Sequence, residues 1–152
     1  MHIFIAGVMQ GARLDDQIDE QDYRLAIMRT LKEHLPNAQI TDPWALNPDS
    51  VDYDEARARE TFLTMTARAG EADLLIAYLP NVSMGTAMEM WEAYRSNTYI
   101  IAVTPHVHHW AIRFTANEIV PDLNSLLELI QSGHLNDIIG DHTVVDSPPH
   151  AD

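Results

Sequence analysis

The run ADLLIAYLP, residues 72–80, stands directly before a helix-like segment, SMGTAMEMWEAYRSN, at residues 83–97. An apolar run that lacks alternating polar residues is typical of a strand covered on both faces. A second such run, TYIIAVTP, follows at residues 98–105. A strand, a helix and a strand in succession predict two parallel strands joined by a right-handed crossover, and therefore an α/β fold.

The rest of the chain continues this alternation. Strands are predicted at residues 2–6, 38–41, 72–80, 98–105 and, at an edge, 118–120. Helices are predicted at 15–35, 53–69, 83–97 and 122–133, a short helix or turn at 108–117, and a proline-rich loop at 42–50. The pattern predicts a Rossmann-like (flavodoxin-like) parallel sheet of about five strands with helices on both faces. We expect a single domain over residues 1–140 and a loose tail over 141–152, which is polar and contains prolines.

The composition restricts the class of partner. The 152-residue chain has a net charge of −14 and no cysteine. A protein this acidic repels nucleic-acid backbones and anionic membrane surfaces, so we expect neither as a bulk partner. Without cysteine there are no disulfides, thiolate zinc sites or cysteine nucleophiles, which fits a cytoplasmic protein. No apolar run is long enough to span a bilayer, and the N-terminus lacks the features of a signal peptide.

Three predicted loops follow strands of this sheet: residues 7–13, 42–47 and 80–86. In open parallel sheets, ligands bind beyond the carboxyl ends of the strands. We therefore expect a small-molecule site where these loops meet.

Glu89 is the first candidate for that site. It lies between two methionines, one helical turn after Gly85. Helical side chains lean toward the N-terminus, so Glu89 would lean into the space that the glycine leaves. The helix dipole would favour an ionised carboxylate there, suited to attack on a sugar carbon. The alternative is that Gly85 only allows close packing on the sheet and that Glu89 is a solvated surface residue.

Ser83 and Thr86 at the start of this helix also have structural alternatives. Serine directly before a helix is usually its N-cap. Thr86 would then be a first-turn residue that bonds to the backbone.

Three segments together, IFIAG at residues 3–7, ADLLIAYLP and SMGTAMEMWEA, resemble the nucleoside 2-deoxyribosyltransferase family over roughly residues 2–120. The resemblance implies that Glu89 of the Gly-x-x-x-Glu helix is the nucleophile. It implies a homo-oligomer in which a neighbouring subunit helps to close each site, and no cofactor or metal.

The first loop, AGVMQGARLDDQ at residues 6–17, is similar to that of the branch that hydrolyses nucleoside 5′-monophosphates. The resemblance implies a phosphate held by this loop, which begins at Gly7, through Gln10, Gly11 and Arg13, together with Ser83. Glycine-rich backbone, an arginine and a helix N-terminus also make an anion site on physical grounds. The alternative is an ordinary turn with an exposed arginine.

Two positions depart from the family pattern. Phe4 stands where the family has a tyrosine that steers the nucleophile, and a phenyl ring cannot hydrogen-bond. The family's aspartate that acts on the leaving base corresponds to a place near Met65. Glu60 is the nearest acid and is our candidate for that role.

The second loop and a histidine cluster supply further candidates. Asp42 and Trp44 lie on the substrate side of the predicted sheet, where Trp44 would either stack on a base or cap the core. Three histidines follow the fourth strand, His106, His108 and His109. Adjacent loop histidines diverge, so we expect a surface or subunit contact there and no metal site.

The third helix carries an apolar stripe of Met84, Met88 and Trp91. Side chains at this spacing belong to the core or to a subunit interface. Together with the family resemblance, the stripe favours a homo-oligomer.

The sequence therefore predicts an enzyme that cleaves or exchanges the N-glycosidic bond of a (deoxy)nucleoside or nucleoside 5′-monophosphate. Its partner is a small molecule, and its product keeps the anomeric configuration. Two alternatives remain: a cytokinin-activating-type phosphoribohydrolase, although that family's glycine pair before the helix is missing here, and a nucleotide-binding sensor without turnover.

Overall fold

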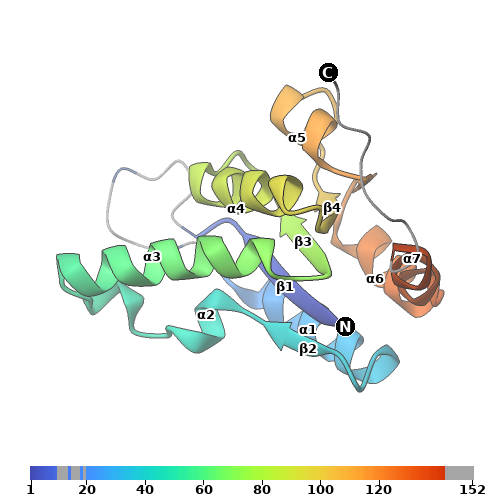
Figure 1. Ribbon diagram of the computed structural model, residues 1–152, viewed down its shortest axis with the longest axis horizontal. Helices are drawn as coiled ribbons and strands as arrows, with labels where there is room; N and C mark the ends of the chain where they lie inside the picture. Colours follow the sequence, from blue (N-terminus) through green and yellow to red (C-terminus); the bar gives the residue numbers. More distant parts are fainter. Residues whose placement is uncertain (10–13, 15–17, 19, 143–152) are drawn as a thin grey trace.

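The computed structural model describes residues 1–9, 14, 18 and 20–142, and its centre is a five-stranded, all-parallel sheet (Figure 1). The strand order is β2-β1-β3-β4-β5. The strands are β1 His2–Gly7, β2 Gln39–Thr41, β3 Leu74–Tyr78, β4 Tyr99–Val103 and β5 Glu118–Val120. This confirms the predicted flavodoxin-like sheet, including the edge position of the fifth strand.

Seven α-helices and one short 3-10 helix lie between and after the strands within the described residues. They are α1 Asp22–His34, α2 Pro43–Leu46, η1 Ser50–Asp52, α3 Glu55–Gly70, α4 Met84–Arg95, α5 Trp110–Thr115, α6 Leu123–Gln131 and α7 His134–His142. No helix in this part of the chain has the length and apolar character needed to cross a membrane.

The sheet divides two apolar cores, because side chains alternate between its faces along each strand. Ile3 and Ile5 of β1 face the core that includes residues of α1 and α6. Phe4 and Ala6 face the other core, which includes residues of α3, α4 and α5. Both faces are therefore covered, as the uninterrupted apolar runs predict.

The first predicted helix begins later than expected. Of the residues predicted to form its first two turns, the described ones, Ile18, Glu20 and Gln21, are not helical, and α1 begins at Asp22. The Gln21 side chain instead donates to the Val8 carbonyl oxygen at 3.2 Å. This bond connects the approach to α1 with the end of β1.

The segment 42–50 is not the simple loop that its prolines predict. Asp42 accepts a hydrogen bond from the Trp44 N–H, and Pro43 occupies the first turn of α2. An N-cap followed by proline is a favourable helix start, so the same residues that break a longer helix begin this short one. The 3-10 helix η1 begins at Ser50, the last residue of the segment.

The C-terminal boundary also differs from the prediction. Helix α7 was not predicted, and it ends at His142. The first two residues of the expected tail, 141 and 142, are therefore helical. Residues 143–152 lie outside the described part of the chain.

Candidate active site

A cavity of about 400 Å³ lies next to Glu89, between the segment that follows β2, helix α3 and helix α4. Its wall is mostly apolar. The described lining residues are Met9, Ile18, Pro43, Asn47, Ser50, Val51, Tyr53, Ala58, Thr61, Phe62, Met65 and Glu89. Glu89 is the only one of them that carries a carboxyl group. We call this space the Glu89 cavity.

The wall formed by residues 43–57 is held by polar contacts. The Tyr53 hydroxyl donates to Asn47 Oδ1 at 3.3 Å, and Asn47 Nδ2 donates to the Pro43 carbonyl oxygen at 3.0 Å. The Arg57 guanidinium carbon lies 3.7 Å from the centroid of the Tyr53 ring. These contacts join α2 to the start of α3 and fix the shape of this wall.

Glu89 is half-buried on α4, and burial raises the pKa of its carboxyl from 4.5 to about 8, against the lowering effect of the Arg24 charge. Burial therefore acts against the ionised carboxylate that the helix dipole was expected to favour. The dipole contributes less than about 1 kcal/mol beyond the first turn, less than one pKa unit. Desolvation outweighs it.

Gly85 leaves the open space that the sequence predicts. A Cβ atom built on Gly85 would meet only the Phe62 ring among the described residues, at 4.0 Å. That is an ordinary van der Waals distance. The alternative, that the glycine allows close packing of the helix on the sheet, is therefore wrong.

Ser83 is the N-cap of α4, which confirms its structural alternative. Its Oγ accepts from the Thr86 N–H at 3.4 Å and from Thr86 Oγ1 at 3.2 Å. Thr86 is buried. Neither residue lines the Glu89 cavity, so their predicted contact with substrate remains a prediction.

Phe4 and Glu60 do not lie on the Glu89 cavity either. Phe4 is fully buried in the core that includes Met65. Glu60 is exposed on α3, whose neighbouring residues Thr61 and Phe62 line the cavity. Successive helical residues turn by about 100°. The helix thus carries Glu60 away from the face on which it would act on a leaving base.

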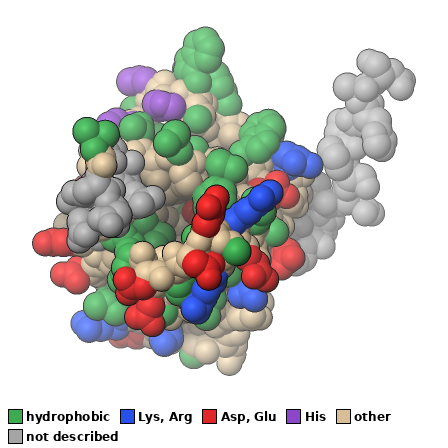
Figure 2. All heavy atoms as spheres, turned by 90° about the vertical axis from the view of Figure 1, so that its left-hand side faces the viewer, with side chains coloured by type: hydrophobic (Ala, Val, Ile, Leu, Met, Phe, Trp, Pro, Cys, Tyr) green, Lys and Arg blue, Asp and Glu red, His purple; other side chains and the backbone are tan. Residues whose placement is uncertain are grey.

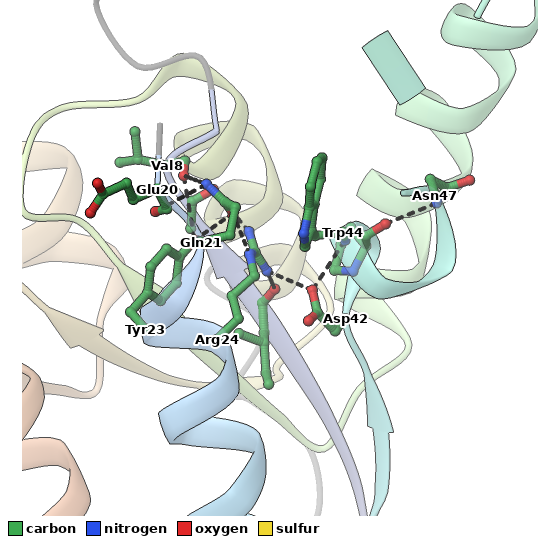
Figure 3. Close-up of polar contacts among 11 residues, drawn as sticks. Val8, Glu20, Gln21, Tyr23, Arg24, Asp42, Trp44 and Asn47 are labelled. Atoms are coloured by element: carbon green, nitrogen blue, oxygen red, sulfur yellow. Dashed lines mark hydrogen bonds and ion pairs between the residues drawn. The ribbon is translucent and has the colours of Figure 1, made fainter. Parts of the chain in front are cut away.

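Asp42 and Gly7 belong to a buried cluster centred on Arg24, a residue that the sequence analysis missed. Arg24 Nη1 donates to Asp42 Oδ1 at 2.8 Å and to the Ile5 carbonyl oxygen at 2.9 Å; Nη2 donates to the Gly7 carbonyl oxygen at 3.3 Å. Nε donates to Gln21 Oε1 at 2.7 Å. Figure 3 shows Arg24 reaching from α1 to Asp42, with Tyr23 and Trp44 on either side.

The sequence did contain a signal for Arg24. It stands three and seven residues before Ile27 and Leu31, two core residues of α1. These positions share one face of a helix. An arginine on an apolar stripe needs buried acceptors, and the strand ends supply them.

Tyr23 completes this cluster from the same helix. Its ring stacks on Tyr78 with 4.1 Å between centroids, and its hydroxyl donates to the Val8 carbonyl oxygen at 3.4 Å. A Cβ atom on Gly7 would overlap the Tyr23 hydroxyl. Gly7 is thus required for packing, while its predicted contact with substrate remains a prediction. Burial raises the Tyr23 pKa, and the negative charges of Asp42 and Glu89 add to this.

The remaining predicted site residues are Trp44 and three residues of the first loop. Trp44 is half-buried beside Asp42, and it is not among the residues that line the Glu89 cavity. Gln10, Gly11 and Arg13 lie outside the described residues. The phosphate site therefore remains a prediction.

The histidine segment lies near the start of α5. His106 Nε2 is 3.2 Å from the Pro80 carbonyl oxygen, on the loop before α4. Within the described ranges, no three His, Cys, Asp or Glu side chains are placed to hold a metal ion.

A second cavity, also of about 400 Å³, lies between α4 and α5. Its lining is almost entirely apolar. The described residues around it are Leu79, Val82, Ser83, Ala87, Met90, Trp91, His109, Trp110, Ala111, Ile112, Phe114 and Thr115. We call this the α4–α5 groove.

Comparison with known proteins finds similarity at the level of structure. No family model and no curated protein sequence matches the chain. A 2-deoxyribosyltransferase from Bacillus psychrosaccharolyticus is similar with a TM-score of 0.62 and 14% identity, over 84% of this chain and 90% of that one. A conserved protein from Enterococcus faecalis V583 has a TM-score of 0.54 and 18% identity, over 88% and 98%. The chain therefore has the fold of a 2-deoxyribosyltransferase.

Proposed function

We propose that this chain is an enzyme of the nucleoside 2-deoxyribosyltransferase family that cleaves or exchanges the N-glycosidic bond of a nucleoside or nucleoside 5′-monophosphate. One observation carries the proposal: Glu89 presents a carboxyl group to a mostly apolar cavity of about 400 Å³, next to the open space over Gly85. Small-molecule sites typically enclose roughly 300–1,000 Å³ behind apolar walls with few polar groups. The shared fold and the Gly-x-x-x-Glu helix support the assignment.

The proposed reaction has two displacements at the anomeric carbon. An ionised Glu89 oxygen forms a bond to this carbon while the bond to the base nitrogen breaks, and the base leaves with the electron pair and takes up a proton. Water then attacks the same carbon and releases the sugar, or a second base attacks and forms a new nucleoside. Two inversions give overall retention. These steps use no cofactor.

In transfer a second base replaces the first base, whereas in hydrolysis water does. Whether the enzyme prefers a nucleoside or its monophosphate depends on how well it binds the 5′-phosphate. We assign phosphate binding to Gln10, Gly11 and Arg13, with support from Ser83 at the N-terminus of α4. A charge-assisted hydrogen bond to phosphate contributes roughly 1.5–3 kcal/mol. Arg13→Ala should therefore weaken use of a monophosphate about ten- to a hundredfold and leave the nucleoside nearly unaffected.

The test is incubation with a panel of nucleosides and their 5′-monophosphates, with and without a second base. Chromatography separates free base, exchanged nucleoside and unchanged substrate. Release or exchange of base by the wild type supports the proposal. A wild-type preference for the nucleoside, or equal losses on both substrates in Arg13→Ala, would exclude the phosphate site and favour the base-exchanging transferase.

A nucleotide-binding sensor is the second candidate, and one observation favours it. Glu60 lies away from the cavity, so the described lining residues supply no second carboxylic acid to protonate a leaving base. A sensor would bind a nucleoside or monophosphate of the same panel, and calorimetry would detect this binding. Chromatography would then recover the compound unchanged.

A further inference from the structure

Asn47 and Tyr53 are joined by a hydrogen bond on the wall of the Glu89 cavity. Both residues line the cavity and are half-buried. The Tyr53 hydroxyl lies 3.3 Å from Asn47 Oδ1, and Asn47 Nδ2 lies 3.0 Å from the Pro43 carbonyl oxygen. Small-molecule sites with apolar walls orient their ligands through a small number of placed polar groups. This pair is therefore a candidate for recognition of the part of the substrate that does not react with Glu89.

The direction of both hydrogen bonds follows from the Pro43 carbonyl oxygen. This oxygen only accepts, so the Asn47 amide has to turn its nitrogen toward it. Oδ1 then faces Tyr53, and because this oxygen carries no proton, the Tyr53 hydroxyl has to donate. The hydroxyl proton is therefore used within the protein. To a ligand in the cavity, Tyr53 offers an oxygen that accepts a hydrogen bond and has no proton left to donate.

The Tyr53 ring is also held by the start of α3. The Arg57 guanidinium carbon lies 3.7 Å from the centroid of this ring, and a cation over an aromatic face is attracted to it. The Arg57 N–H in turn donates to the Asp54 carboxylate at 2.8 Å, which fixes the backbone at this helix end. A group that is already ordered before binding loses less entropy when it contacts a ligand. The Tyr53 oxygen is thus an acceptor with a fixed position.

We propose that Tyr53 is a specificity-determining residue: its hydroxyl oxygen, oriented by Asn47, accepts a hydrogen bond from the base of the substrate, so that bases with an exocyclic amino group are preferred over their oxo counterparts. The inference rests on the proposed function, which places a base in the Glu89 cavity. Cytosine and adenine carry such an amino group, whereas uracil and hypoxanthine carry an oxo group at the same position. An oxo group would face the Tyr53 oxygen as a second acceptor, and both would stay unpaired.

The other polar groups on the wall are compatible with such a base. Asn47 Nδ2 has a second hydrogen without an acceptor among the described residues, and it can donate to the unprotonated ring nitrogen beside the amino group. The hydroxyls of Ser50 and Thr61 can both donate and accept, so they do not separate the two kinds of base. The described lining includes no lysine or arginine whose charge would favour an oxo group.

The test is calorimetric titration with the 2′-deoxynucleosides of cytosine, uracil, adenine and hypoxanthine and with their 5′-monophosphates. Glu89→Gln serves as the background, because it prevents turnover during the titration. In this background, the amino-bearing member of each pair should bind at least about tenfold more tightly than the oxo-bearing member. Adding Tyr53→Phe removes the acceptor and should bring each pair within about threefold. Adding Asn47→Leu releases the hydroxyl proton, which can then donate to an oxo group, and should have the same effect.

Two further variants serve as controls. Asn47→Asp keeps an oxygen acceptor for the Tyr53 hydroxyl and should keep the preference for amino-bearing bases. Tyr94→Phe removes a hydroxyl from an exposed position of α4 outside the cavity lining and should leave the preference unchanged. Circular dichroism and thermal unfolding check the fold of every variant. If Asn47→Leu does not fold, Tyr53→Phe decides alone.

A preference for amino-bearing bases that disappears in Tyr53→Phe supports the inference, because a purely structural role would weaken the binding of all compounds equally. A preference for oxo-bearing bases, or a ratio that is the same with and without the Tyr53 hydroxyl, overturns it. The failure of the proposed function looks different: the compounds bind with the expected preference, yet the wild type releases base from none of them. Absence of binding by every compound overturns both.

Discussion

At the scale of single residues, a carboxyl group in an apolar cavity has two opposing requirements. Glu89 has to be ionised to act as a nucleophile, yet burial raises its pKa to about 8. The sequence identified Glu89 and Gly85 because helical spacing places them together. It did not predict the protonation state, since this depends on desolvation and on the charge of Arg24, which comes from a different helix.

The raised pKa of Glu89 predicts how the proposed activity depends on pH. Only the ionised form attacks, so kcat/KM should rise with pH and level off above about 8. One unit below the midpoint about a tenth of the enzyme is active, and two units below about a hundredth. Initial rates of base release between pH 5 and pH 10 measure the profile. A rate that is flat from pH 5 to pH 8 would contradict a buried Glu89 nucleophile.

At the scale of secondary-structure elements, the sequence predicted most strands and helices because both faces of the sheet are covered. It failed where side chains decide the local backbone. Asp42 caps α2 within an apparent loop, and Gln21 bonds to Val8 ahead of α1. It also missed α7. Candidate site residues on α4 were placed by helical spacing. Glu60, in contrast, was chosen only as the acid nearest to the position of the family's aspartate.

Helix α4 provides a prediction of its own at Gly85. Its surroundings are open, so Gly85→Ala should stabilise the helix by roughly 0.5–1 kcal/mol. Thermal unfolding measures this. Gly85→Leu should also fold, but its side chain would occupy the space next to Glu89 and abolish substrate binding. Normal activity in a folded Gly85→Leu variant would show that substrate does not use this space.

At the scale of the whole molecule, apolar side chains gather on one side. Met84 and Trp110 are 85% and 75% exposed, and Met88 and Trp91 are also exposed, so the predicted stripe is not part of the core. The upper part of Figure 2 shows hydrophobic and histidine side chains, while acidic side chains gather lower on the same face. For a chain with a net charge of −14, such a surface is where two copies repel each other least.

We therefore propose that the protein forms a homo-oligomer through the α4–α5 groove and the apolar side chains around it. Trp91→Glu and Trp110→Glu should each reduce the molar mass measured by light scattering to that of a smaller species. Leu25→Glu, at an exposed position of α1 on the other face of the sheet, is the matched control and should leave it unchanged. A wild type that is monomeric at the assay concentration would count against this interface.

The most direct test of the account is the release of free base by the wild type and by Glu89→Gln, measured side by side on a nucleoside or monophosphate that the wild type uses. Glutamine preserves the size of the side chain and removes the nucleophile. We predict that the variant keeps its fold and loses at least about a thousandfold in rate. A folded Glu89→Gln variant that releases base at a rate close to that of the wild type would contradict the central role of Glu89.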